Sequence, residues 1–544
     1  MRHQLDRAHD PVRPLVGLCL ALCALLPAYG PALADTTLPT TLGAEEEGPL
    51  TFPQTEQLEV ELDDVVVMAL RHNLSLVVER YRRQGTLLGI REAMGIYDLN
   101  LNATLETSSS TRPPNSTLEA ADIVVSDRDR WNFSLTQLTR WGGTAAVTFN
   151  NTLFESSNQA VQPNPQYEST FTVGFDQPLL RNFGREVTER SLIVARNNVG
   201  INLEVFRTQV ETIVQQVADN YWNLAEAKEQ LKVSLESLEL AKELHEMNRI
   251  QVEVGTMAPL EMVQSEVGVA TREEQIIRDR AAVQDAEDAL RRLANLEQGD
   301  LWDVEIVPTT NPEIAHEPID VAEAVRVAAS NRPDVIRRKL ENETLALDSR
   351  ISENATKPTL DLEAGYGYNS LAGDEILPDG QEVSGGWSDA LDQIADGDFD
   401  SWRVTLTFGY PIQNRAARAA AARAELAAKQ GEYELRDLLG QVLLEVRRTA
   451  RGVDTAAKAI ESAKVSSKLA RKNLEAEQKR YENGLSTSFQ VLEIQEDLSQ
   501  ARSREVSAII GYRRALTAYQ QATGQLLDAY AIELENGDSA GATE

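Results

Sequence analysis

Cysteine is nearly absent from this 544-residue chain, which contains only Cys19 and Cys23. Both lie in a short apolar run, Leu15 to Leu26, which follows three arginines and precedes the small-residue pattern Ala32-Leu33-Ala34. This order is typical of a secretory signal peptide over residues 1–34. The mature chain would then contain no disulfide, no thiolate metal ligand and no cysteine nucleophile, so packing or self-association must stabilise it.

Long hydrophobic runs are also missing. The run from Leu15 to Leu26 is too short to cross a bilayer as an anchor, which is the alternative to secretion. Leucine precedes each cysteine, so neither fits the small-residue pattern of a lipid-attachment site. No later stretch reaches about 18 consecutive apolar residues, so no transmembrane helix is predicted.

Residues that carry chemistry are scarce. The only histidines are His3, His9, His72, His245 and His316. They form no metal-spaced cluster, and there is no nucleophile elbow, phosphate-binding glycine loop or HExxH motif. An enzyme, a metal site or a cofactor is therefore not expected. The formal charge of −32 disfavours nucleic acid and anionic membrane surfaces as partners, although much of it also serves solubility.

Proline is missing between Pro178 and Pro259 and again after Pro411. In the first of these stretches apolar residues recur every seven positions, which is typical of a coiled-coil seam rather than a broad core-facing stripe. The seam comprises Leu203, Val210, Val217, Leu224, Leu231 and Leu238, beside a second row of Val199, Phe206 and Ile213. A single helix over 185–254 would be roughly 105 Å long.

Shorter helical patterns flank each long one and match its length in pairs. The pairs are 62–97 with 257–296 beside 185–254, and 319–356 with 486–523 beside 415–483. Each half of the chain thus predicts one long rod and one composite rod. Their seams are too narrow to close the core of a single copy, which favours self-association, with a dimeric coiled coil as the alternative.

Between the helical patterns the period changes from 3.6 to 2, as in β-strands. The alternating runs are 99–106, 170–176, 360–368 and 402–410. Runs with one apolar face, one polar face and aromatics near their ends are what a transmembrane β-barrel requires, although a soluble two-faced sheet also alternates. Four strands cannot close a barrel around a channel, so closure would need several copies.

A further hairpin pattern comprises Trp131–Leu138 and Thr144–Leu153, around Gly142-Gly143. It fits two arrangements, one that adds strands to the barrel and one that extends above the membrane.

The two halves of the chain share one order of elements, and residues 62–73 resemble 320–331. We therefore predict an α+β, mostly α, internally duplicated protomer. Its segments are a signal peptide (1–34), an N-terminal linker (35–57), repeat 1 (58–296), an inter-repeat segment (297–318), repeat 2 (319–524) and a flexible acidic tail (525–544).

Over residues 58–527 the sequence resembles the TolC family of outer-membrane efflux proteins. The motifs that carry the resemblance are the paired openings at 62–73 and 320–331, Gln177–Gly184, Arg480–Glu493 and a weaker copy of the latter at 252–264. The resemblance implies a homotrimer with four strands per copy in one 12-stranded β-barrel, above an α-helical barrel that crosses the periplasm.

Such a protein would be a passive exit duct in contact with outer-membrane lipid. It would dock with a periplasmic adaptor and, indirectly, an inner-membrane pump, for drug efflux or for type I secretion. The alternative is a structural coiled-coil protein that spans the envelope and transports nothing, but it would have no need of duplicated amphipathic strands.

The resemblance also places two glycine motifs at helical-hairpin tips. Gly255 and Gly484 suit the left-handed turn at the end of a helix, and this alone accounts for the residue types. Thr256, Ser486, Thr487 and Ser488 are expected to cap the returning helices. The resemblance adds an adaptor contact on Val254, Gly255, Thr256, Met257, Tyr481, Gly484, Leu485 and Ser486.

Glu261 and Glu493 lie where the family has inward-facing aspartates. Three copies of each would form rings of negative charge at the pore aperture and favour cations. Glutamate is longer than aspartate, and an ordinary solvent-facing role is the alternative for both residues.

Overall fold

A computed structural model describes residues 57–115, 119, 122–158, 160–295, 304–312, 318–376 and 381–534. All of them belong to one unit of the chain, Glu56–Glu544. The expected signal peptide and nearly all of the N-terminal linker lie outside these residues, as does the part of the tail after residue 534.

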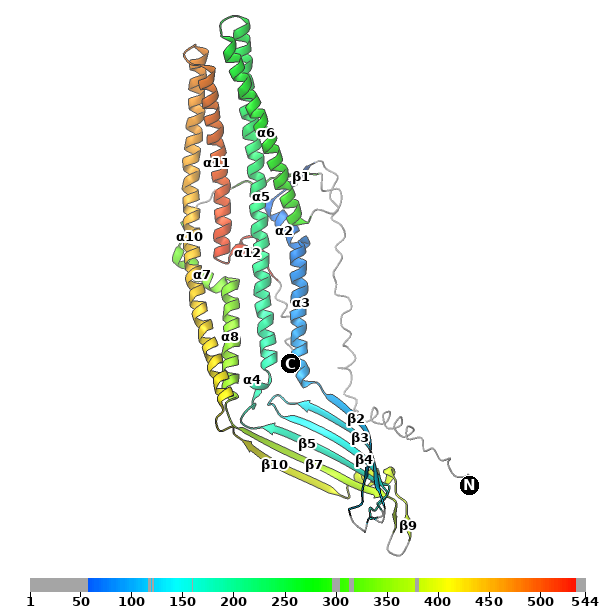
Figure 1. Cartoon of the computed structure of the whole chain (residues 1–544). Coiled ribbons are helices and arrows are strands. Elements are labelled where there is room, and N and C mark those ends of the chain that lie inside the picture. Colours follow the sequence, from blue (N-terminus) through cyan, green and yellow to red (C-terminus); the bar gives the residue numbers. More distant parts are fainter. Residues whose placement is uncertain are drawn as a thin grey trace, which may run out of the picture. The chain divides into compact units, whose positions relative to one another are not determined.

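Two long helices dominate the described part of the chain, as the heptads predicted. Helix α5 (Arg190–Glu253) follows one turn of helix, α4 (Arg185–Thr188), and helix α10 is Arg415–Glu482. Neither contains proline after its start, so no backbone donor is missing along its length. Figure 1 shows both running beside shorter helices.

The shorter helices form the expected composite rods. In repeat 1 they are α2 (Leu62–His72), α3 (Leu74–Met94), which a 3₁₀ turn (Gly95–Tyr97) follows, and α6 (Pro259–Ala294). In repeat 2 they are α7 (Val321–Asn331), α8 (Pro333–Asn354) and α11 (Ser488–Ala522). Helices α3 and α6 pack along α5, while α8 and α11 pack along α10. The composite rods break where Asn73 and Arg332 are extended, the latter because Pro333 disfavours a helical residue before it.

The strands form one antiparallel sheet of six, in the order β10-β7-β5-β4-β3-β2. Their bounds are β2 Asn100–Arg112, β3 Val124–Leu138, β4 Thr144–Ser156, β5 Gln166–Pro178, β7 Thr359–Gly373 and β10 Asp400–Gly409. The hairpin around Gly142-Gly143 therefore adds strands to the sheet, which has six strands in one copy. A small helix, α9 (Trp387–Asp396), follows a short hairpin, β8 (Glu375–Ile376) with β9 (Glu382–Val383), and packs on β5 and β7.

Paired residues line up in rows across all six strands, and neighbouring rows face opposite sides of the sheet. One row is apolar throughout: Leu101, Leu135, Val147, Val173, Tyr366 and Trp402. The next is polar or small: Asn102, Ser134, Thr148, Thr172, Gly367 and Ser401. The sheet thus has one apolar and one polar face.

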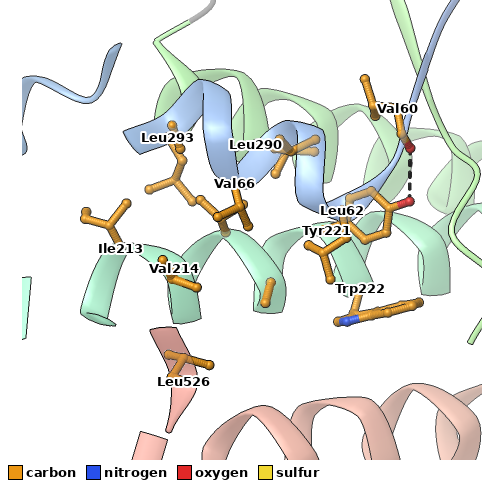
Figure 2. Close-up of a cluster of buried hydrophobic side chains, with 14 of the residues drawn as sticks. Val60, Leu62, Val66, Ile213, Val214, Tyr221, Trp222, Leu290, Leu293 and Leu526 are labelled. Atoms are coloured by element: carbon orange, nitrogen blue, oxygen red, sulfur yellow. Dashed lines mark hydrogen bonds between the residues drawn. The ribbon is translucent and has the colours of Figure 1, made fainter. Parts of the chain in front are cut away.

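The largest buried cluster lies near the middle of α5, where α2, α6 and the short helix α12 (Leu526–Ala529) meet it. Tyr221 of α5 accepts a hydrogen bond from Thr310 N at 2.9 Å and donates one to Val60 O at 3.1 Å. These bonds fix the parallel pair β1 (Gln57–Val60) and β6 (Glu305–Pro308), as Figure 2 shows for Val60.

Two of the expected segment boundaries differ from those in the structure. Leu526 and Leu527 are buried in it, so the chain stays ordered beyond residue 524 and the start of the expected flexible tail was placed too early. Gln57 likewise belongs to β1 rather than to a linker.

No described helix combines the length and the apolarity that crossing a bilayer would require.

Glu211 of α5 is a buried acid in this region with an incomplete set of partners. Its side chain is buried, and Oε1 lies 3.4 Å from Arg207 without accepting a hydrogen bond. Burial raises the pKa of Glu211 to about 7, although Arg207 and Arg332 lower it. The unfolded chain releases this proton near its ordinary pKa of 4.5. The contribution of Glu211 to stability is therefore highest below pH 4.5 and is lost as the pH rises to about 7.

We predict that Glu211→Gln makes the melting temperature less dependent on pH between 5 and 8. At pH 8 the variant should be more stable than the parent by on the order of 2–3 kcal/mol, because no buried charge has to form. Thermal melts by circular dichroism at both pH values measure this. Glu239→Gln, at an exposed position of the same helix, is the control and should leave the pH dependence unchanged. An equal pH dependence in Glu211→Gln and the parent would show that Glu211 is ionised throughout.

Candidate functional site

Two helical hairpins end in equivalent turns. Gly255 follows α5 with a φ of 77°, and Gly484 follows α10 with a φ of 70°. In the first turn Thr256 N donates to Gln251 O, and in the second Leu485 N donates to Arg480 O at 2.8 Å. Together with bonds from the two glycine amides, this is the Schellman pattern that closes a helix with a left-handed glycine. The predicted turn geometry is confirmed at both tips.

The caps differ from the prediction at most positions. Thr487 is the N-cap of α11 and accepts from Gln490 N. Thr256 instead donates to Gln251 O at 3.0 Å, and α6 begins with Pro259 and has no side-chain cap. Ser486 and Ser488 donate to glutamates, Glu477 and Glu261 respectively.

The tips carry exposed apolar side chains. Val254 is 67% exposed and Leu485 is 70% exposed, as expected for two members of the predicted contact surface. Leu260, Val263 and Phe489 are also mostly exposed, and the sequence analysis did not select them. Leu260 and Phe489 lie in the first turns of α6 and α11, and Val263 lies in the second turn of α6. These five residues are called the tip patch below.

Tyr481 has a different environment from the rest of its motif. It is only 6% exposed and packs with Leu244 and Leu474. Its hydroxyl donates to Oδ1 of Asn248 on α5 and lies 3.7 Å from Met257 Sδ. Burial, and to a smaller extent the charge of Glu261, raise the pKa of Tyr481 to about 12, so the hydroxyl stays protonated and can donate. Tyr481 and Met257 thus link the two hairpins, while Val254, Gly255, Thr256, Gly484 and Leu485 are exposed.

Glu261 and Glu493 have unlike surroundings. Glu261 is half-buried, and its Oε2 accepts from the hydroxyl of Ser488, which is fully buried on α11. Glu493 is exposed on the same helix. Within one copy, Glu261 therefore faces the second hairpin, whereas Glu493 is open to solvent.

A second link joins the hairpins further from the tips. Arg272 of α6 is buried, and its pKa is lowered by that burial. Its guanidinium donates to Ser237 Oγ at 2.9 Å and to Leu492 O at 3.5 Å, and lies 3.9 Å from Glu496. Arg272 therefore joins α5, α6 and α11, and the sequence analysis missed it together with Asn248. An isolated arginine or asparagine in a coiled-coil stretch gives no signal of such a contact.

Among the described residues, no group of three or more histidine, cysteine, aspartate or glutamate side chains could hold a metal ion. What the region offers is two linked hairpins with exposed apolar ends and charged side chains between them.

Comparison with known proteins agrees with this geometry. The model of the family "Outer membrane efflux protein" matches residues 144–296 and 324–525, well over half of the chain. No curated protein matches the sequence.

Solved outer-membrane channels have a similar fold. OprN superposes with a TM-score of 0.61 at 15% identity, over 85% of this chain and 90% of OprN. VceC from Vibrio cholerae gives 0.60 at 17% identity, over 85% of this chain and 96% of VceC. CmeC from Campylobacter jejuni gives 0.58 at 15% identity, over 86% of both chains. The family match, which includes both hairpins and four strands of the sheet, shows that this chain belongs to the outer membrane efflux protein family.

Proposed function

We propose that three copies of this chain form an exit duct that passes through the outer membrane and extends into the periplasm. The observation that carries the proposal is the sheet, whose apolar and polar residues separate into rows across six strands. An apolar face of this width needs lipid, and the polar face is suited to line a water-filled bore. The number of copies follows the resemblance to the TolC family.

The helices supply the second half of the duct. Helix α5 begins soon after β5 and ends at a tip, so its 64 residues separate the sheet from the tip by roughly 95 Å. A spacer that transports nothing would need the rods but not a two-faced sheet. We expect export with a signal peptide and no lipid anchor, and passive transport without catalysis.

A periplasmic adaptor is the partner that we propose for the tips, with an inner-membrane pump reached only through it. The tip patch supports this, because exposed apolar side chains at a helix end are typical of a protein contact. Drug efflux and type I secretion both fit such a duct.

Conductance and ion selectivity test the proposed pore. The mature protein should form ion-conducting pores in planar bilayers, and Glu261→Gln combined with Glu493→Gln should lower the cation-to-anion permeability ratio, because the aperture then loses its negative charge. Glu59→Gln, on β1, is the control and should leave selectivity unchanged. Properly assembled protein without conductance would contradict the duct.

Channel opening tests the hydrogen bond that links the two helical hairpins. Tyr481→Phe keeps the buried ring but leaves Asn248 without its donor, which costs about 1–3 kcal/mol in the linked state. The open probability of single channels should therefore rise at least severalfold. Tyr433→Phe, at an exposed position of the same helix, should have no effect. If both variants behave as the parent does, the hydrogen bond between Tyr481 and Asn248 does not restrain the tips.

Cross-linking and export test the tip patch as the contact surface for the adaptor. Val254→Asp with Leu485→Asp should abolish cross-linking to the cognate adaptor and export in cells, because charged side chains replace the most exposed apolar contacts. Conductance in bilayers should persist, since neither residue is buried. Glu482→Gln, also exposed at the tip, is the control. Normal export by the double variant would exclude the tip patch as the docking surface.

A further inference from the structure

The sheet contains two strands that the matched family region does not. That region begins at residue 144, so it includes β4, β5, β7 and β10, whereas β2 and β3 precede it. Strand β3 nevertheless pairs with β4 from Ser126–Ser156 to Leu138–Thr144. The β-hairpin formed by β2 and β3, called the first hairpin below, is therefore a continuous part of the sheet and not a separate appendage.

The first hairpin also lies at the same level as the other strands. Leu101 of β2 and Leu135 of β3 occupy the same apolar row as Trp402 of β10, and Phe133 shares the next apolar row with Phe149. Between these rows lies the polar row that begins with Asn102. A hairpin that stood in water above the membrane would need no apolar face at this level. Leu101 and Leu105 are 63% and 64% exposed, and lipid would cover them as it covers Trp402.

The outer edges of β2 and β10 have no strand partner within the residues that the structure describes. An unpaired edge cannot persist in the hydrocarbon region, because water is not available to its backbone groups. Neighbouring strands alternate in direction across the six, so β2 and β10 run in opposite directions. A second copy can therefore place its β2 antiparallel to β10 and keep both apolar faces on the same side.

We propose that β10 of each copy pairs with β2 of the next copy, so that every copy contributes all six strands to the barrel. The proposal rests on the three-copy duct described above, and it changes the barrel from 12 strands to 18. Barrel diameter grows with strand number, from about 24 Å to about 36 Å between backbones at a strand spacing of about 4.8 Å and a tilt of about 40°. The section in the outer membrane is then a wide bore, and the narrowest passage lies among the helices.

Disulfide cross-linking tests the proposed contact, because the sequence after the expected signal peptide contains no cysteine. Thr405→Cys on β10 is combined, one at a time, with cysteine on the polar face of β2, at Asn100, Asn102, Thr104, Glu106 or Ser108. Oxidation of the assembled protein in membranes should give covalent dimers and trimers in at least one of the five combinations. Five positions are needed because barrel shear shifts the register between copies.

The competing arrangement has 12 strands, with β10 next to β4. Thr405→Cys is therefore also combined with cysteine on the same face of β4, at Thr144, Ala146, Thr148 or Asn150. Cross-links between copies in this set, or trimers in which no β2 position cross-links, would overturn the 18-strand barrel.

One further double variant, within a single copy, reports whether β3 stays in the sheet. Ser134→Cys with Thr148→Cys joins directly opposed residues of β3 and β4. It should lose its free thiols on oxidation without an increase in mass. If the two thiols stay reduced in the assembled protein, the first hairpin has left the sheet and the proposal is wrong.

The mass of the cysteine-free protein in detergent gives the number of copies, and it therefore tests the duct separately from the number of strands. Three copies with cross-links to β4 would overturn only the strand number. A protein that stays a single copy in membranes would overturn both the strand number and the duct.

Discussion

The outer edges of β2 and β10, which pair with no strand in the part of the chain that the structure describes, are the constraint on which the rest of the structure depends. An antiparallel sheet with one apolar face can be soluble if helices cover that face, but among the described helices α9 is the one with extensive contact to the sheet, at β5 and β7. Phe408, Val404 and Trp402 remain mostly exposed on one edge strand, as do Leu101 and Leu105 on the other. Lipid can cover the face, and only another strand can satisfy the edges. In the proposed duct, membrane insertion and assembly therefore both depend on these two edge strands.

The long helices also carry apolar surface that a single copy leaves exposed. Each long helix buries one narrow seam against its composite partner, and Leu443, Leu444, Val465 and Leu469 of α10 stay exposed. A seam of this kind is satisfied by a ring of helices, in which every helix has two neighbours. In the proposed duct, the sheet and the helices therefore surround one axis with the same number of copies, which would couple the assembly of the two parts.

The elements that repeat with a regular period could be predicted from the sequence. Helical periodicity and the absence of proline predicted the bounds of α5 and α10 to within a few residues, and the left-handed turns expected at Gly255 and Gly484 are confirmed. The alternating pattern of β3 was recognised only from Trp131 onward, and the place of its hairpin was left open, because the start of the strand is charged. Arg130 pairs with Glu106 at 3.1 Å, and Arg128 lies 4.9 Å from the ring of Phe154, so partners on neighbouring strands compensate charges that disguise the strand pattern.

Contacts between distant segments could not be predicted in the same way. Tyr481 and Asn248 lie 233 positions apart, and neither residue type indicates that the other is its partner. The same holds for Arg272 with Leu492 and for Ser488 with Glu261. All three contacts join repeat 1 to repeat 2, as do the hydrogen bond from Gln495 Nε2 to Leu240 O at 3.1 Å and the ion pair of Arg502 with Glu236, so several polar contacts hold the two hairpins of one copy together. In the proposed duct the bore is wide, and the hairpins, which contacts of this kind hold together, are the proposed place where passage is regulated. In the proposed duct, the sheet therefore fixes the opening in the outer membrane, and the contacts between the repeats act on the opening at the tips.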